Sequence, residues 1–220
     1  MKTDKKLARV ILLLIGLVIA HFGVTLFLQV ELGADPFNVF IEGLFKTVSG
    51  WTDAAWITHG RVHMAVSLLI ILILLLVDRS YIRIGTVLCM VCGGPIIDFF
   101  NLLLDPLKLA EASLAVRVLL NGLGCVILAY GMTIVITSEA GTGPNDLVAV
   151  VLSETLRKKF SIVRIIVDIL FAGLGFLMGG TVGLGTIICA FLVGLVAGVF
   201  MPVNRKLIDS ILAKIPAKKV

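Results

Sequence analysis

Charged residues are scarce in this 220-residue sequence. Asp, Glu, Lys and Arg together make up 15% of the chain, whereas hydrophobic residues make up 59%. A water-soluble domain has roughly a quarter of its residues charged, so this chain has too little polar material to cover a soluble surface. Several of its apolar runs approach the ~20 residues that cross a bilayer core. The composition therefore predicts an all-α integral membrane protein.

Residues that usually carry catalysis or hold metals are also few. The chain has three histidines and four cysteines, and all four cysteines lie within apolar runs. Cys89-x-x-Cys92 has the spacing of a redox motif, but a thiol in such surroundings is most often a small packing residue. Motifs for a nucleophile elbow, a zinc protease or a phosphate-binding loop do not occur. We therefore expect no enzyme activity, no metal site and no cofactor.

The apolar runs predict six membrane spans. The first is too long for a signal-peptide core, and no Ala-x-Ala-like cleavage site follows it, so we expect it to be retained. The formal net charge is +5, but the basic residues flank apolar runs, which indicates membrane topology rather than nucleic-acid binding. Most of the 19 lysines and arginines lie near the two ends and in two of the loops, which places both termini in the cytoplasm. The predicted spans are Val10–Val30, Arg61–Val77, Ile84–Leu104, Arg117–Thr137, Ile162–Met178 and Gly185–Met201.

Two breaks in the apolar pattern share one motif. Glu31–Pro36 and Glu139–Pro144 both read Glu-x-Gly-x-x-Pro. A proline suits the first position of a helix, where its missing N–H costs nothing. We therefore predict short helices at Pro36–Val48 and Pro144–Leu156. Both are too short to span the membrane, so each is either re-entrant or interfacial.

The motif belongs to a longer internal repeat. Each half contributes three spans, an odd number, so the two halves enter the membrane from opposite sides. Such inverted repeats are frequent among secondary transporters. We predict one membrane domain at 1–220, with repeats at about 7–104 and 115–201 and a basic cytoplasmic tail at 202–220. When the chain is slid along itself, a first repeat shift aligns Gly23, Thr25, Glu31, Gly33, Pro36 and Leu44 with Gly131, Thr133, Glu139, Gly141, Pro144 and Leu152, and a slightly smaller second repeat shift aligns Gly85, Thr86, Cys89, Gly94 and Phe100 with Gly185, Thr186, Cys189, Gly194 and Phe200.

The two breaks supply most of the candidate substrate-binding residues. Each offers a helix N-terminus, which favours anions, and carboxylates, which favour cations or protons. Asp35 is a good N-cap, whereas Gly143 has no capping side chain and leaves more N–H groups for a ligand. The alternative is that glycine and proline only mark tight turns between spans. The candidates are Glu31, Gly33, Asp35, Asn38, Glu139, Gly141, Gly143, Asn145 and Asp146.

Ionisable residues inside predicted spans complete the candidate list. His21 and Asp98 lie about equally far from the assumed cytoplasmic ends, so they could meet and carry a proton or a cation, or form a structural hydrogen bond. Arg164 and Asp168 are one turn apart, which indicates an internal ion pair or a substrate clamp. Gly194-x-x-x-Gly198 has the small-residue spacing typical of close helix contacts.

At Gly33–Val39 and Gly141–Leu147 the chain resembles the YitT/YczE-like family of bacterial membrane proteins. The resemblance covers the order of spans, the repeated Gly-x-x-Pro pattern, and Ile84-Gly-Thr86 with Leu184-Gly-Thr186. It implies a multi-pass protein of the bacterial inner membrane. Those family patterns are aromatic after the first proline, as Phe37 is here, and acidic where this chain has Asn38.

The sequence favours a small secondary transporter or exporter that works by alternating access between its halves. One alternative is the substrate-binding subunit of an energy-coupling vitamin transporter, which is also a small six-span basic protein. Another is a non-transporting membrane partner or assembly factor. The expected partners are membrane lipid, a small-molecule or ion substrate and a second copy of the chain in a homo-oligomer, with no nucleic acid.

Overall fold

The computed structural model of the protein describes residues 2–51, 56–77, 79–158 and 160–215. Within these ranges every regular element is helical, which confirms the predicted all-α class. Three short 3₁₀ turns, η1 (Arg79–Tyr81), η2 (Asp105–Leu107) and η3 (Leu109–Glu111), connect the longer helices. The α-helices are α1 (Lys2–Val30), α2 (Pro36–Trp51), α3 (His59–Val77), α4 (Ile84–Leu104), α5 (Leu114–Thr137), α6 (Pro144–Thr155), α7 (Phe160–Leu177) and α8 (Leu184–Lys214).

Five of the described helices are long and apolar enough to cross a membrane, namely α1, α3, α4, α5 and α8. α7, at the predicted fifth span, has a shorter apolar part, Ile165–Leu177. Large apolar side chains cover the outside of the bundle, among them Leu76, Leu177 and Phe191, which are 89%, 81% and 71% exposed. Such a surface suits lipid rather than water. The protein is therefore an all-α membrane protein, and the count of six spans stays a prediction.

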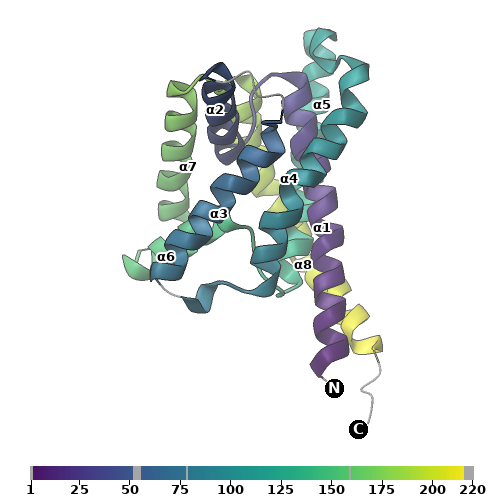
Figure 1. Ribbon diagram of the computed structural model, residues 1–220. Coiled ribbons are helices and arrows are strands. Elements are labelled where there is room, and N and C mark those ends of the chain that lie inside the picture. Colours follow the sequence, from purple (N-terminus) through teal and green to yellow (C-terminus); the bar gives the residue numbers. More distant parts are fainter. Residues whose placement is uncertain (1, 52–55, 78, 159, 216–220) are drawn as a thin grey trace.

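α1 and α5 lie side by side along the bundle (Figure 1). Their closest contacts are made at glycines, which let helix backbones approach. A Cβ atom placed on Gly16 would lie 2.8 Å from the carbonyl oxygen of Gly131, and one placed on Gly23 would lie 2.6 Å from that of Gly124. The first repeat shift converts one contact into the other, because it aligns Gly16 with Gly124 and Gly23 with Gly131. The two helices thus pack as equivalents.

The two short helices lie at opposite ends of the bundle (Figure 1). Both α2 and α6 pack against α3 and α7. The start of α1 and the end of α8 lie toward the α6 end (Figure 1). Ala34 and Val39, around the start of α2, are buried in one cluster with Phe27, Cys125 and Cys189 of the long helices. This burial favours the re-entrant arrangement of α2 over the interfacial one.

α8 is longer than the sequence predicts. The last span was expected to end at Met201, before Pro202, but the helix continues through Pro202 to Lys214. Asn204, Ile208 and Leu212 recur every fourth residue, and all three are buried. The Asn204 side chain and the apolar pair pack on α5 residues. Burial of this face explains why the helix persists past a proline, which normally disfavours helix interiors.

Gly194 and Gly198 of α8 do not make the close helix contact that their spacing predicts. Nothing among the described residues lies within 4 Å of a Cβ atom placed on either glycine. Both residues lie on a face of α8 that looks away from the rest of the bundle. The spacing rule therefore gives no close contact in this part of α8, whereas the glycines of α1 and α5 do form one.

Candidate functional site

The first break, residues 31–35, has a backbone conformation that few residues adopt. Glu31 and Gly33 have positive φ angles of 49° and 102°. A Cβ atom on Gly33 would lie 2.5 Å from a side-chain oxygen of α8, so only glycine fits. The carbonyl groups of the break accept hydrogen bonds from the second half of the chain. Gly185 donates its N–H to Leu32 O at 2.7 Å, and Asn121 donates Nδ2–H to Gly33 O at 3.0 Å.

The start of α2 is capped as the sequence predicts. The Asp35 carboxylate accepts the backbone N–H of Asn38 at 3.4 Å and the side-chain Nδ2–H of Asn38 at 2.6 Å. One of the free N–H groups of the first turn is thereby satisfied. Asn38 Oδ1 is buried and has no hydrogen-bond partner among the described residues. The cap is therefore confirmed, and Asn38 keeps an unpaired acceptor in the interior.

The second break repeats this backbone conformation. Glu139 and Gly141 have φ angles of 55° and 155°. A Cβ atom on Gly141 would lie 2.5 Å from the backbone nitrogen of Thr86. Gly85 donates its N–H to Ala140 O at 3.0 Å. The two repeat shifts convert this bond into the Gly185–Leu32 bond of the first break, so each break is bound by the start of the last helix in the other half.

The start of α6 lacks a side-chain cap, again as predicted. Gly143 occupies the N-cap position with φ −60° and ψ 145°, and as a glycine it has no side chain to cap the helix. Pro144 follows at the first helical position. Asn145 Nδ2 donates to Asp146 Oδ1 at 3.2 Å, so the two polar candidates of this turn contact each other.

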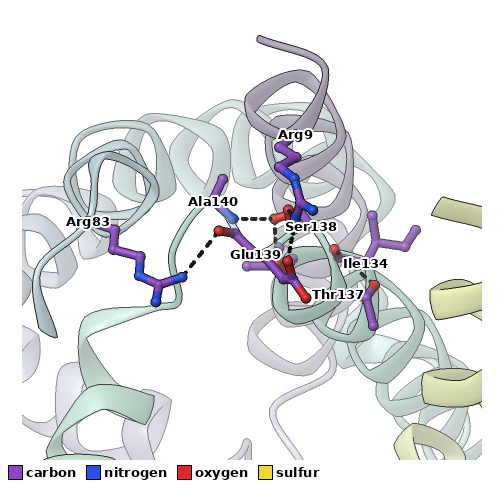
Figure 2. Close-up of polar contacts among 8 residues, drawn as sticks. Arg9, Arg83, Ile134, Thr137, Ser138, Glu139 and Ala140 are labelled. Carbon is purple, nitrogen blue, oxygen red and sulfur yellow. Dashed lines mark hydrogen bonds and ion pairs between the residues drawn. The ribbon is translucent and has the colours of Figure 1, made fainter. Parts of the chain in front are cut away.

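Two arginines converge on the second break (Figure 2). Arg9 of α1 donates to Ser138 O at 2.9 Å and forms an ion pair with Glu139 Oε2 at 2.6 Å. Arg83 donates to Glu139 O at 3.3 Å. The Ser138 hydroxyl accepts the N–H of Ala140 at 3.2 Å. These donors satisfy carbonyl groups at the end of α5 that have no partner inside the helix.

The first break has the equivalent arginine. Arg117 of α5 donates Nε–H to Val30 O at 2.8 Å and Nη2–H to Glu31 O at 3.1 Å. The first repeat shift aligns Arg9 with Arg117 and Val30 with Ser138. One difference remains: Glu139 forms an ion pair with Arg9, whereas none of the ion pairs in the described part of the chain involves the Glu31 carboxylate.

A cavity of about 690 Å³ opens at the end of the bundle where the first break lies. The end of α1, α2, the start of α3, the end of α4 and the following 3₁₀ turns form its wall. Volumes of this size are usual for sites that bind small molecules. Its polar and charged lining residues are Gln29, Glu31, Glu42, Lys46, Thr58, His59, Asp98, Asn101, Asp105, Lys108 and Glu111.

Carboxylates outnumber cationic groups in this lining. Five acidic residues face two lysines, and each lysine already pairs with a carboxylate. Lys46 lies 2.6 Å from Glu42 Oε1, and Lys108 lies 3.4 Å from Glu111 Oε1. The acidic excess makes the cavity electronegative, which favours positively charged solutes.

Glu42 connects α2 to the turn after α7. Its two carboxylate oxygens accept the backbone N–H of Thr181 at 2.9 Å and the hydroxyl of Thr181 at 2.7 Å. Burial acts to raise the pKa of Glu42, but hydrogen bonds from Lys46 and Thr181 outweigh it, so that the pKa lies below its ordinary value. Glu42 is therefore ionised at neutral pH, as the negative charge of the cavity requires.

A row of polar side chains continues from the cavity into the bundle along α3. His59, His63 and Ser67 recur every fourth residue and share one face of the helix. All three are buried, and His59 and His63 are each only 8% exposed. Both ring nitrogens of His59, Nδ1 of His63 and Oγ of Ser67 have no hydrogen-bond partner within the described ranges. A buried unpaired polar group costs ~1–3 kcal/mol, so this row indicates a place for a solute or water.

The His21 ring of α1 packs against His63, the second residue of this row. The ring centroids of His21 and His63 are 5.6 Å apart in an edge-to-face arrangement. Phe37 of α2 contacts His63 at 5.5 Å between ring centroids. Gly93 leaves room for the pair, because a Cβ atom there would lie 2.9 Å from His21 Nε2 and 3.2 Å from His63 Cε1. Residues from α1, α2, α3 and α4 thus meet around these rings.

His21 and Asp98 have different partners, although the sequence brings them to a similar depth. Asp98 accepts the Thr58 hydroxyl at 2.5 Å and the Gly60 N–H at 2.9 Å, so it caps the start of α3. His21 Nδ1 lies 2.9 Å from Leu17 O within its own helix. Two residues at the same depth in the membrane can still point to different sides of the bundle and contact different helices. The side chain of Arg164 lies outside the described residues, so its pair with Asp168 stays a prediction.

Sequence reasoning missed two parts of this site. No site role was predicted for His59 and His63, although the pattern His59-x-x-x-His63-x-x-x-Ser67 marks one polar face of an otherwise apolar helix. Arg9 and Arg117 were interpreted only through the topology and the ends of the spans. Their alignment under the first repeat shift was visible in the sequence and indicates equivalent roles.

Apolar spans with a lipid-facing surface, two broken helices and a polar interior define a multi-span α-helical membrane protein. The chain belongs to a family of unknown function (DUF6198), whose family pattern matches residues 7–202. It is 32% identical over 202 residues to the uncharacterized membrane protein YczE of Bacillus subtilis, covering 90% of this chain and 88% of the relative. This agrees with the YczE-like family that the two breaks indicate.

Two other relatives cover most of the chain. The uncharacterized protein YyaS of Bacillus subtilis is 26% identical over 192 residues, or 87% of this chain and 92% of the relative. An uncharacterized protein of Haemophilus influenzae is 26% identical over 199 residues, or 89% and 84%. No solved structure matches the chain.

Proposed function

We propose that the protein is a small secondary transporter of the bacterial inner membrane, which moves a small solute by alternating access between two inverted repeats. The observation that carries this proposal is the cavity of about 690 Å³ at the first break, which leads to a row of buried side chains with unpaired polar atoms. Ionisable and polar groups inside a membrane bundle are costly, and they usually mark a solute pathway.

The reciprocal contacts between the halves support the inverted repeat. Arg9 binds the second break as Arg117 binds the first, and the glycine contacts of α1 and α5 exchange in the same way. Transporters of this architecture place broken helices next to the solute site and move one repeat against the other. In the proposed topology, six spans bring both termini to the cytoplasmic side, and the cavity opens on the outer side.

Uptake by reconstituted protein tests the proposal. A thermal-shift screen of metabolites and ions on the purified full chain first selects solutes that stabilise it, since ligand binding raises the stability of the folded state. Each radiolabelled hit is then measured for saturable uptake into proteoliposomes, with Asn38→Ala as the site variant. The exposed residue Asp209 provides the matched control, Asp209→Asn.

We expect saturable uptake by the wild type and the control, and loss of uptake in the site variant at equal reconstitution. Binding without uptake of any hit would contradict the transporter. In that case, an ATPase pair that copurifies with the chain would identify the solute-binding subunit of an energy-coupling transporter instead.

A further inference from the structure

We propose that the cavity at the first break binds an organic cation, whose ammonium or guanidinium group is held by His59 and Asp98 of the lining. The inference rests on the proposed transporter and names the chemical class of its solute. Three independent observations carry it: the charge of the lining, the unpaired nitrogens of His59 and the apolar part of the wall.

The charge of the lining selects a cation. Once Lys46 and Lys108 are paired with Glu42 and Glu111, the carboxylates of Glu31, Asp98 and Asp105 remain without a lysine partner in the described lining. A cleft that carries one sign of charge between low-dielectric walls concentrates solutes of the opposite sign. An anionic solute would be repelled by these carboxylates.

His59 supplies an acceptor that lacks a partner. It lines the cavity, is only 8% exposed, and neither of its ring nitrogens has a hydrogen-bond partner among the described residues. A neutral imidazole has one acceptor nitrogen, which suits an N–H of an ammonium or guanidinium group. The Asp98 carboxylate lines the same cavity, and hydrogen bonds that involve a charged group are about twice as strong as those between neutral groups.

The titratable groups that lie near these rings come from α1, α2 and α4. Glu42 of α2 and Asp98 of α4 act on His59. His21 of α1 lies against His63. α6 packs against α3 with apolar side chains, among them Leu147 and Val151. The carboxylates nearest to the row are therefore those of the cavity lining.

The wall distinguishes an organic cation from a metal ion. No group of three or more His, Cys, Asp or Glu side chains within the described ranges is arranged to hold a metal. Part of the lining is apolar instead, including Leu28, Phe45 and Ile57, which suits a carbon skeleton. The Phe45 ring packs against His59 with centroids 6.2 Å apart, so it lies near the expected cationic group.

Binding of four small molecules with a butyl or C4 chain to the purified full chain tests the charge preference of the cavity. Butylamine and butylguanidine carry the cation, 1-butanol is the neutral control, and butyrate is the anionic control. We expect a saturable rise in melting temperature with the two cations and none with the alcohol or the carboxylate. A response to butyrate or 1-butanol equal to that of butylamine would overturn the inference, as would the absence of any response to both cations.

Two variants locate the binding group. His59→Phe keeps the ring and removes its nitrogens, and Asp98→Asn keeps an oxygen that can cap α3 while removing the charge. Each should weaken butylguanidine binding at least tenfold, whereas Asp209→Asn should not change it. Unchanged binding in both folded variants would place the cation elsewhere and refute the site. The wild-type probe series remains decisive if a variant fails to fold.

Uptake separates this inference from the proposed function. If cations bind with these dependences but no proteoliposome uptake occurs, the cation site stands and the transporter fails. If a neutral or anionic solute is taken up while cations do not bind, the transporter stands and the cation site fails.

Discussion

A methyl group at the α1–α5 contact should destabilise the protein. In Gly131→Ala, the new Cβ would lie 2.3 Å from the backbone nitrogen of Ala20 and 2.6 Å from Gly16 O. Ordinary contacts are 3.4–4 Å, so the helices must separate by roughly 1 Å, and a gap of that size forfeits a quarter to a half of the dispersion energy between facing atoms.

The expected magnitude follows from two opposing effects. Overpacking of a close contact costs about 1–3 kcal/mol, and replacing glycine by alanine inside a helix returns up to about 1 kcal/mol. With the full return, the net loss is up to about 2 kcal/mol, which corresponds to a fall in melting temperature of up to about 8 °C for a chain of this size. Gly23→Ala should behave alike, because its Cβ would lie 2.6 Å from Gly124 O.

The matched control is on the same helix as Gly131. A Cβ atom on Gly122 has nothing within 4 Å, so Gly122→Ala should keep or raise the melting temperature. Thermal unfolding of the purified variants in one detergent, followed by the fluorescence of a thiol-reactive or intrinsic probe, measures the difference. Equal melting temperatures for Gly131→Ala and Gly122→Ala would refute the close α1–α5 contact.

Three further predictions follow from the same structure. Arg9→Glu and Glu139→Arg should each lower the fraction of monodisperse protein after heating. The double variant should recover part of that fraction, because it restores the 2.6 Å ion pair with the charges exchanged. If the double variant recovers nothing, the two residues act separately. Truncation after Met201 should lower the melting temperature, since it removes the buried Asn204, Ile208 and Leu212, whereas truncation after Ile215 should not. Equal melting temperatures for the two truncated proteins would contradict the packing of the last turns of α8 on α5. In intact cells, a single cysteine at Lys108 should react with an impermeant thiol reagent and one at Lys214 should not; labelling at Lys214 would overturn the proposed orientation.

Local sequence signals predicted the breaks well. Pro36 and Pro144 begin α2 and α6, and Asp35 caps α2, because these features depend on a few neighbouring residues. The apolar runs likewise located the long helices. The end of α8 was missed, because a proline argues locally against a helix, whereas the burial of Asn204 on α5 is a tertiary contact that no local rule contains.

The partners of the polar residues were harder to predict. Distance along a helix gives depth, so it placed His21 level with Asp98, but it does not give the direction of a side chain around the bundle. His21 faces His63 instead. The repeat held more information than was used: the shift that aligns Glu31 with Glu139 also aligns Arg9 with Arg117, and both arginines bind the break of the opposite half.

The reciprocal arginines have a consequence for the order of biosynthesis. Arg9 is synthesised long before the second break, so its side chain is already present when Ser138 and Glu139 leave the ribosome. The first break has no such partner when it is translated, because Arg117 lies 86 residues beyond Glu31. Arg117 is translated only after α2, α3 and α4. Its carbonyl groups lack these partners until α5 supplies Arg117 and Asn121 and α8 supplies Gly185. The nascent first half is thus incomplete by itself, and the first break acquires its last partner, the N–H of Gly185, only when α8 has been made.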